Sequence, residues 1–138
     1  MANTRHTVVV RKDLNLSPGL LAAQVAHISD AFMRKKISLQ NCPDPMVSKD
    51  IAAMNKWNEN ELDWFHAPYI SVLAVNTREE LEHISNQAKE ANVPVHEWHD
   101  IIPSEVLNGH SLNHFIGISI GPDDFDKIKL ITGTLPLF

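Results

Sequence analysis

The stretch VVVRKDLNLSPGLLAAQVAHISDAF, from Val8 to Phe32, decides the fold because it carries an apolar strand directly into a helix. The continuous run Val8-Val9-Val10 is typical of a strand buried on both faces, as in parallel sheets, and predicts a strand over Thr7–Lys12. Ser17 and Pro18 fit the N-cap and the first helical position, where the missing N–H of proline costs nothing. This strand-to-helix order favours the α/β class.

Two stripes of side chains run along the predicted helix, which we expect to end near Lys36. An apolar stripe that faces the core consists of Leu21, Val25, Ile28 and Phe32. A second stripe, turned away from it, consists of Leu20, Gln24, His27 and Ala31. The basic group Arg34-Lys35-Lys36 then falls in the last turn, where cations oppose the negative end of the helix dipole.

Outside this stretch, the pattern predicts further strands over Tyr69–Val75, Val93–Trp98 and His114–Ile120. Ser48 can cap a helix that carries Ile51, Met54 and Trp57. The capping box Thr77-Arg78-Glu79-Glu80 opens another helix. Gly121-Pro122-Asp123 is expected to cap a last helix, which ends at Gly133. The element order predicts a three-layer α/β sandwich, a small mixed four-stranded sheet with helices on both faces, as a single domain over residues 1–138. Because a long helical connection joins the first two strands, we expect them to be parallel.

Length and composition narrow the class of protein. The 138 residues suffice for one domain that needs no disulfide or metal for stability, and the single cysteine, Cys42, fits a reducing cytosol. No stretch resembles a signal peptide or a membrane span, so we expect a cytoplasmic protein. Seventeen acidic against twelve basic residues give a net charge of −5, which argues against broad nucleic-acid affinity.

Three polar side chains are expected at one corner of the fold. In open α/β sheets, sites lie beyond the carboxyl ends of the strands, and Asp13 follows such an end directly. Gln24 and His27 neighbour each other on the helix that rises from the same corner, so the three can converge on one pocket. Each also has an ordinary interpretation: Asp13 as a turn cap, Gln24 as a solvated helix residue and His27 as a boundary histidine.

The eight histidines give little support to a metal site. His96 and His99 are expected on opposite faces of a strand, and a strand begins between His110 and His114. The sequence has no HExxH, P-loop, GxGxxG or GxSxG motif, so we expect neither a metal nor a cofactor.

Several motifs resemble those of the type II peptidyl-tRNA hydrolases, the archaeal and eukaryotic kind. The resemblance is carried by Arg11-Lys12-Asp13-Leu14, Gly19, Ala22-Ala23-Gln24 and His27, and by the ending Ile118-Ser119-Ile120-Gly121-Pro122 with Thr132-Gly133 and a terminal aromatic residue. It covers most of the chain and is weakest over residues 37–65 and 101–113. It implies a cofactor-free esterase that frees a peptide from the 3′ end of a tRNA, usually as a homodimer.

The resemblance also implies roles for individual residues. The aspartate that the family carries after its third strand matches Asp100, which is the expected catalytic residue together with Gln24, His27 and Asp13. The expected substrate-binding residues are Arg11, Lys12, Gly19 and His99. Such a site activates water, stabilises an oxyanion and holds tRNA phosphates.

The chain departs from the family at its cations. Leu20 stands where the family has a lysine after the glycine, and the position of a second family lysine falls near Ala74. The Gly-Arg-Thr segment after the aspartate is replaced by Ile101-Ile102-Pro103-Ser104. His27, His99 or His110 could substitute for the missing groups, since imidazole acts as base or donor near neutral pH.

Two hypotheses follow. The first is a peptidyl-tRNA hydrolase or a close ester-hydrolysing relative. The second is a binding module on the same scaffold that has lost catalysis and recognises a small anionic ligand, a protein or its own copy, since a fold does not fix a function. Trp57, Trp64 and Phe65 could form a partner surface, although aromatic residues at helical spacing are more often core.

Overall fold

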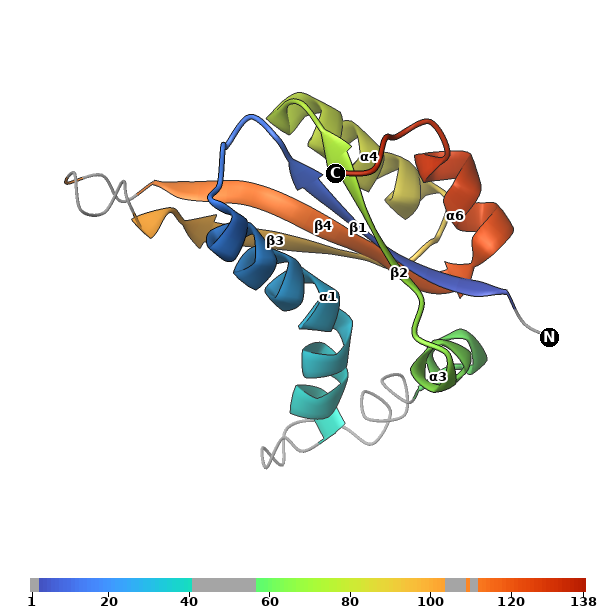
Figure 1. Ribbon diagram of the computed structural model, residues 1–138. Helices are drawn as coiled ribbons and strands as arrows, with labels where there is room; N and C mark the ends of the chain where they lie inside the picture. Colours follow the sequence, from blue (N-terminus) through green and yellow to red (C-terminus); the bar gives the residue numbers. More distant parts are fainter. Residues whose placement is uncertain (1–2, 41–56, 104–108, 110–111) are drawn as a thin grey trace.

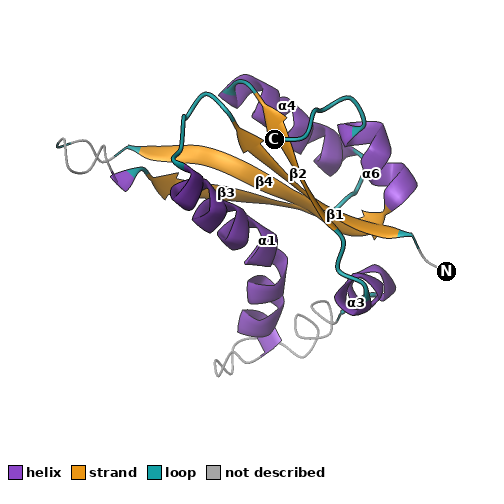
Figure 2. Cartoon of the chain, viewed as in Figure 1, coloured by secondary structure: helices purple, strands orange, loops and turns teal. Residues whose placement is uncertain are grey.

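The computed structural model describes residues 3–40, 57–103, 109 and 112–138 (Figures 1 and 2). In chain order its elements are β1 (Thr4–Arg11), α1 (Pro18–Gln40), α3 (Glu59–His66), β2 (Ile70–Val75), α4 (Arg78–Glu90), β3 (Val95–Ile101), β4 (Asn113–Asp124) and α6 (Phe125–Thr132). The predicted cap at Ser48, with Ile51 and Met54, lies outside the described residues, as does Cys42. Among the described helices, none is long and apolar enough to cross a membrane.

The four strands form one mixed sheet in the order β2-β1-β4-β3. β1 pairs with β2 in parallel, whereas β4 is antiparallel to both β1 and β3. The predicted α/β class and the parallel pairing of the first two strands are confirmed. Because β1, β2 and β3 all run in the same direction, their carboxyl ends meet at one edge of the sheet.

Helices cover both faces of the sheet, with α4 and α6 on one face and α1 and α3 on the other (Figure 1). Under α4 and α6 the core includes Val9, Leu81, Ile118 and Ile128, all 2% exposed or less. Under α1 it is built from Val8, Val10, Ile28 and Ile116, each fully buried. The Val8-Val9-Val10 run therefore contributes to both cores, as its unbroken apolar pattern predicts.

Gly117 lets α1 approach the sheet closely. A Cβ atom at this position of β4 would lie 2.6 Å from the Val9 carbonyl oxygen and 2.8 Å from Cδ1 of Ile28. Real Cβ atoms essentially never lie this close to another heavy atom, so the backbone of β1 or the helix α1 would have to shift. A glycine here sets how close the buried stripe of α1 lies to the centre of the sheet.

Three boundaries differ from the prediction, because polar residues continue elements that they were expected to end. α1 runs to Gln40, so the expectation that Arg34-Lys35-Lys36 occupies the last turn is wrong. β3 extends to Ile101, beyond the predicted end at Trp98, and therefore includes His99 and Asp100. β4 continues through Gly121-Pro122-Asp123, and the N-cap of α6 is Asp124, whose side chain accepts from the Asp126 N–H. α3 begins with its own capping box between Asn58 and Glu61.

Polar contacts fix α3 and the chain end to the sheet. The Lys36 Nζ lies 3.2 Å from Oε1 of Glu61, which joins α1 to α3. At the opposite side of the sheet, the tail pairs with β2: the Ala74 N–H donates to the Pro136 carbonyl and the Phe138 N–H to the Val72 carbonyl, both at 3.0 Å. The tail is therefore held against β2 by its backbone.

Candidate functional site

The Gln24 amide is the centre of the candidate site. Its oxygen accepts a hydrogen bond from the Trp98 indole N–H at 2.6 Å, and its nitrogen donates to Oδ2 of Asp100 at 3.0 Å. Only 4% of Gln24 is exposed, so the interpretation as a solvated helix residue is wrong. The structure thus joins Gln24 and Asp100, which are 76 residues apart in the chain.

β3 brings Trp98 and Asp100 to the same place because alternate residues of a strand share one face. Trp98 packs with the core under α1, and Asp100 turns the same way, towards Gln24. The second carboxylate oxygen of Asp100 accepts from the Ile101 N–H at 2.8 Å. Across the ladder, Asp100 pairs with His114 of β4. The carboxylate is therefore held from two sides at the carboxyl end of an edge strand.

His27 and Arg34 extend this arrangement along α1. The exposed His27 ring stacks on Trp98, with the ring centroids 5.0 Å apart and an angle of 16° between the planes. The Arg34 guanidinium lies 5.4 Å from the Trp98 ring centroid and donates to the His27 carbonyl at 2.8 Å. Seven residues are almost two helical turns, so both side chains leave α1 on the same side.

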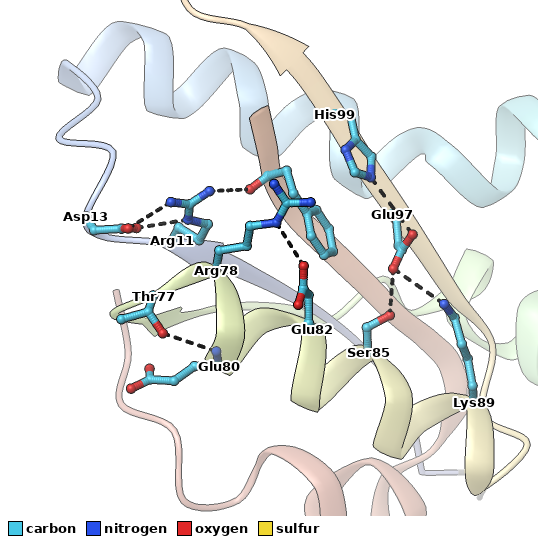
Figure 3. A network of polar contacts seen from close by, with 11 residues as sticks. Arg11, Asp13, Thr77, Arg78, Glu80, Glu82, Ser85, Lys89, Glu97 and His99 are labelled. Atoms are coloured by element: carbon cyan, nitrogen blue, oxygen red, sulfur yellow. Dashed lines mark hydrogen bonds and ion pairs between the residues drawn. The ribbon is translucent and has the colours of Figure 1, made fainter. Parts of the chain in front are cut away.

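Asp13 belongs to a different contact. Its carboxylate forms a two-pronged ion pair with Arg11 at 2.8 and 2.9 Å, and Arg11 also donates to the Phe115 carbonyl (Figure 3). The hydrogen bonds from Arg11 are the main cause that lowers the pKa of Asp13, with smaller effects from the charges of Arg11 and His114. Among the described residues, Asp13 bonds to Arg11 and not to Gln24, His27 or Asp100. It lies at the same sheet edge without touching the centre of the site.

His99 lies on the other face of β3, away from Gln24. Its ring stacks on Phe115 at 4.6 Å, and its Nε2 is 3.9 Å from Oε2 of Glu97 (Figure 3). Two other predicted binding residues, Lys12 and Gly19, are exposed near the β1–α1 corner, where the Lys12 Nζ lies 5.6 Å from the Phe138 ring. The structure therefore separates the substrate-binding candidates into the corner residues and His99.

A cavity of about 470 Å³ adjoins the corner and is mostly apolar. It is lined by Leu14, Asn15, Leu16, Ser17, Leu20, Ile102 and Pro103. Leu20, one helical turn before Gln24, thus forms part of a pocket wall where the family resemblance would place a lysine. Ala74 is 2% exposed in β2, so that position too offers no cation to a ligand. Among the residues that the structure describes, no three His, Cys, Asp or Glu side chains are grouped to hold a metal.

Sequence reasoning missed Trp98, Arg34 and His114. Trp98 and Asp100 would have been found together if the strand had been extended by three residues, because period-2 alternation then puts them on one face. Arg34 follows His27 by seven residues and was assigned to the helix end instead. His114 lies opposite Asp100 and contributes to the lowered pKa of Asp13, a placement that only the register of β4 reveals.

The family model and the similar sequences agree on one family. The family described as "Peptidyl-tRNA hydrolase PTH2" matches residues 4–138. A protein of Nanoarchaeum equitans named peptidyl-tRNA hydrolase is 32% identical to this chain, over 95% of this chain and 96% of that protein. A protein of Methanopyrus kandleri with the same name is 33% identical, over 96% of this chain and 97% of that protein. A solved structure of a protein of unknown function from Agrobacterium has a TM-score of 0.51 at 17% identity, over 100% of this chain and 99% of that one, and supports the fold alone.

Proposed function

The chain belongs to the peptidyl-tRNA hydrolase family PTH2, and from this membership we propose that it hydrolyses the ester between a peptide and the 3′ end of a tRNA. The match begins at residue 4 and reaches the last residue, so we also propose that residues 1–138 act as one domain of this family.

The observation that supports this proposal best is the bridge that Gln24 makes between Trp98 and Asp100. An ionised carboxylate has about four lone-pair positions, and the bonds from Gln24 and Ile101 use two of them. No hydrogen bond from another described residue uses the remaining positions, which can accept a hydrogen bond from water. Because both existing bonds restrain the carboxylate, a water bound to it is held in one orientation.

In the proposed reaction, Asp100 accepts a proton from this water while the water oxygen attacks the ester carbonyl carbon. The bond between the carbonyl carbon and the ribose oxygen then breaks, Asp100 returns the proton to the ribose oxygen, and the free peptide acid leaves. His27 is exposed and stacks on Trp98, which shares the hydrogen-bond partner Gln24 with Asp100, and His27 is the proposed donor to the substrate carbonyl. Gln24 is almost fully buried, so we assign it to positioning Asp100.

The corner residues have supporting roles in this proposal. Asp13 holds Arg11, and the pair fixes the start of the β1–α1 turn. The exposed Lys12 and the first turn of α1 at Gly19 face the phosphates of the RNA, since helix N-termini and cations both attract anions. His99 remains a candidate only for a part of the substrate that passes over the edge of β3.

The test is release of peptide from an N-acetylaminoacyl-tRNA. We expect Asp100→Asn to lower kcat/KM by roughly 10²- to 10⁴-fold, the usual effect of removing a general base. His27→Ala should lower kcat with a smaller effect on KM. Unchanged turnover in both variants would show that these residues do not carry the reaction.

The alternative is a binding module without catalysis, favoured by the uncharged Leu20 and the buried Ala74 at the two lysine positions. Wild-type protein that is fully folded and releases no peptide at high concentration would support this alternative. RNA binding that weakens steeply with salt, together with turnover, would support the hydrolase.

A further inference from the structure

We propose that the groove along the edge strand β3, between α1 and α4, binds the phosphate backbone of the RNA that carries the scissile ester. The proposal rests on the proposed hydrolase function. It assigns to Arg34, Lys35 and Lys89 the phosphate contacts that Leu20 and Ala74 cannot make.

The groove is built from three elements. Its volume is about 450 Å³, and its wall consists of Ala31, Arg34 and Lys35 from α1, Lys89 from α4, and Val95, His96, Glu97 and Trp98 from β3. All of these residues belong to the described part of the chain. Although α1 and α4 lie on opposite faces of the sheet, β3 is its outermost strand, so cations from both helices reach the same edge.

The three cations are available to a ligand to different degrees. Arg34 is exposed and uses one of its five N–H donors on the His27 carbonyl, which leaves the others for phosphate oxygens. Lys35 is exposed as well. Lys89 lies 3.4 Å from Glu97 Oε1 with 53% of its side chain exposed, an ion pair that contributes little in water and can be exchanged for a phosphate (Figure 3).

The local charge of the groove differs from that of the whole chain. The chain carries −5 overall. Three cations and the single carboxylate of Glu97 give the groove wall a charge of 3 − 1 = +2. Burial, followed by the nearby charges of Lys35 and Lys36 against that of Glu61, lowers the pKa of His96, so this residue is neutral at pH 7 and adds nothing. The groove is thus a positive strip on an acidic protein, suited to a polyanion.

Trp98 connects the groove to the candidate site. One edge of its indole donates to Gln24, which holds Asp100, while the ring also lines the groove beside Arg34. The exposed His27 ring, stacked on Trp98, extends this aromatic surface to solvent. A site for single-stranded nucleic acid usually combines cations along the phosphate backbone with aromatic rings on which the bases stack. An RNA end lying in the groove would therefore lead to Asp100.

The test measures binding of a fluorescently labelled acceptor-arm minihelix RNA with an unpaired 3′-CCA end and no amino acid, so that no ester can react. We expect Arg34→Gln, Lys35→Gln and Lys89→Gln each to weaken binding by roughly threefold to tenfold. Each should also reduce the slope of log K against log salt by about one. Glu97→Gln should tighten binding several-fold, because it removes the one carboxylate and releases Lys89.

The matched control is Lys127→Gln, which removes one exposed lysine from α6, on the face of the sheet opposite α1. It should bind like the wild type. Equal weakening by Lys127→Gln and Lys35→Gln would overturn the proposal, because net charge alone would then explain the effect. So would groove variants that bind normally but change the sedimentation of the protein, since the groove would then be a contact between copies.

Measuring peptide release by the wild type as well distinguishes failure of the groove proposal from failure of the proposed hydrolase function. Wild-type turnover with unchanged minihelix binding and unchanged KM in the three groove variants would overturn the groove while the hydrolase stands. A raised KM with unaltered kcat in these variants, beside the lowered kcat of Asp100→Asn, would support both. Wild-type protein that neither binds the minihelix nor releases peptide would overturn both.

Discussion

At the scale of single residues, the candidate site is a chain of two hydrogen bonds through one buried amide. The Gln24 carbonyl can only face the Trp98 donor, and its NH₂ can only face the Asp100 acceptor, so the two partners fix the orientation of the amide. A change at Trp98 therefore reaches Asp100 without touching it. This gives Trp98 a role that its aromatic packing alone does not indicate.

We expect Trp98→Phe to lower kcat and to destabilise the fold by about 1–3 kcal/mol, because the buried Gln24 oxygen loses its donor. Trp64→Phe is the matched control, since the Trp64 indole donates to the Tyr69 carbonyl at 2.8 Å away from the site. It should cost similar stability and leave kcat unchanged. Urea unfolding and peptide release measure the two effects. A kcat that falls equally in both variants would indicate general loosening.

His6 is a second buried polar residue, and it makes the fold sensitive to acid. It is fully buried between the rings of Phe32 and Trp64, and neither ring nitrogen has a hydrogen-bond partner among the described residues. Burial, and to a lesser degree His96, lowers the pKa of His6 from 6.5 to about 4. The unfolded chain thus binds a proton below pH 6.5 that the folded chain accepts only near pH 4.

Stability should therefore fall as the pH drops through this interval, by about 2 kcal/mol from His6 between pH 7 and pH 5. His6→Phe keeps an aromatic ring and cannot be protonated, so we expect the variant to be less sensitive to pH and more stable than the wild type at pH 5. The residual slope belongs to His96, which faces Lys35, Lys36 and Glu61. Denaturant unfolding at pH 5, 6 and 7 tests this, and parallel curves for both proteins would contradict it.

Site residues on a helix could be predicted from the sequence more easily than site residues at the end of a strand. Gln24 and His27 follow from helical periodicity, because α1 begins at Pro18 where the capping signal predicts. The contact of Asp100 with Gln24 could be inferred only through family resemblance. In physical terms it depends on β3 running three residues beyond Trp98, and strand ends in polar sequence carry little signal. Arg34 was overlooked for the related reason that α1 is longer than its apolar stripe.

At the scale of elements, the distance between α1 and the sheet depends on Gly117. A methyl group there would meet the Val9 carbonyl and the Ile28 side chain. Because Gln24 lies one turn before Ile28 on α1, any outward shift of the helix also lengthens the contacts of Gln24 with β3. Core packing and site geometry are coupled through this glycine.

We predict that Gly117→Ala destabilises the fold by about 1–3 kcal/mol, as overpacking does, and lowers kcat by displacing α1. Gly19→Ala is the control for stability: a Cβ atom there meets nothing within 4 Å, and alanine favours a helix. Its melting temperature should equal or exceed that of the wild type. A Gly117→Ala variant as stable as Gly19→Ala would show that α1 does not need the close approach.

The elements themselves were largely predictable, whereas their ends were not. The Val8–Val10 run, the apolar stripe of α1 and the Thr77 cap of α4 each agree with the structure, since every one rests on a strong local signal. The prediction that Gly121-Pro122-Asp123 caps the last helix is wrong, because it depends on the usual tendency of glycine and proline to interrupt strands. Here pairing of Asp123 and Asp124 with β1 continues β4 past the proline.

At the scale of the whole molecule, the two edges of the sheet differ in whether another segment covers them. Backbone hydrogen bonds from the tail cover the outer edge of β2. In the described part of the chain, no segment pairs with the outer edge of β3, where the groove lies. An uncovered strand edge offers unpaired N–H and C=O groups to any extended chain.

Removal of residues 136–138 should therefore destabilise the protein and promote its self-association, because the β2 edge loses its cover. Light scattering at increasing protein concentration measures this. Leu137→Ser is the matched control: it keeps the backbone bonds and changes only a side chain that is 74% exposed. It should stay as dispersed as the wild type. Equal scattering by the truncated and the full-length protein would show that the tail does not protect this edge.

The tail has a consequence for growth into larger assemblies. A protein with two uncovered sheet edges can add further copies at both edges and so form a continuous fibre. A protein with one uncovered edge can pair with a single further copy through that edge. In the described part of this protein the tail covers the β2 edge and leaves the β3 edge open, so strand addition is expected to stop at two copies. We therefore expect residues 136–138 to limit growth by strand addition through their backbone pairing with β2.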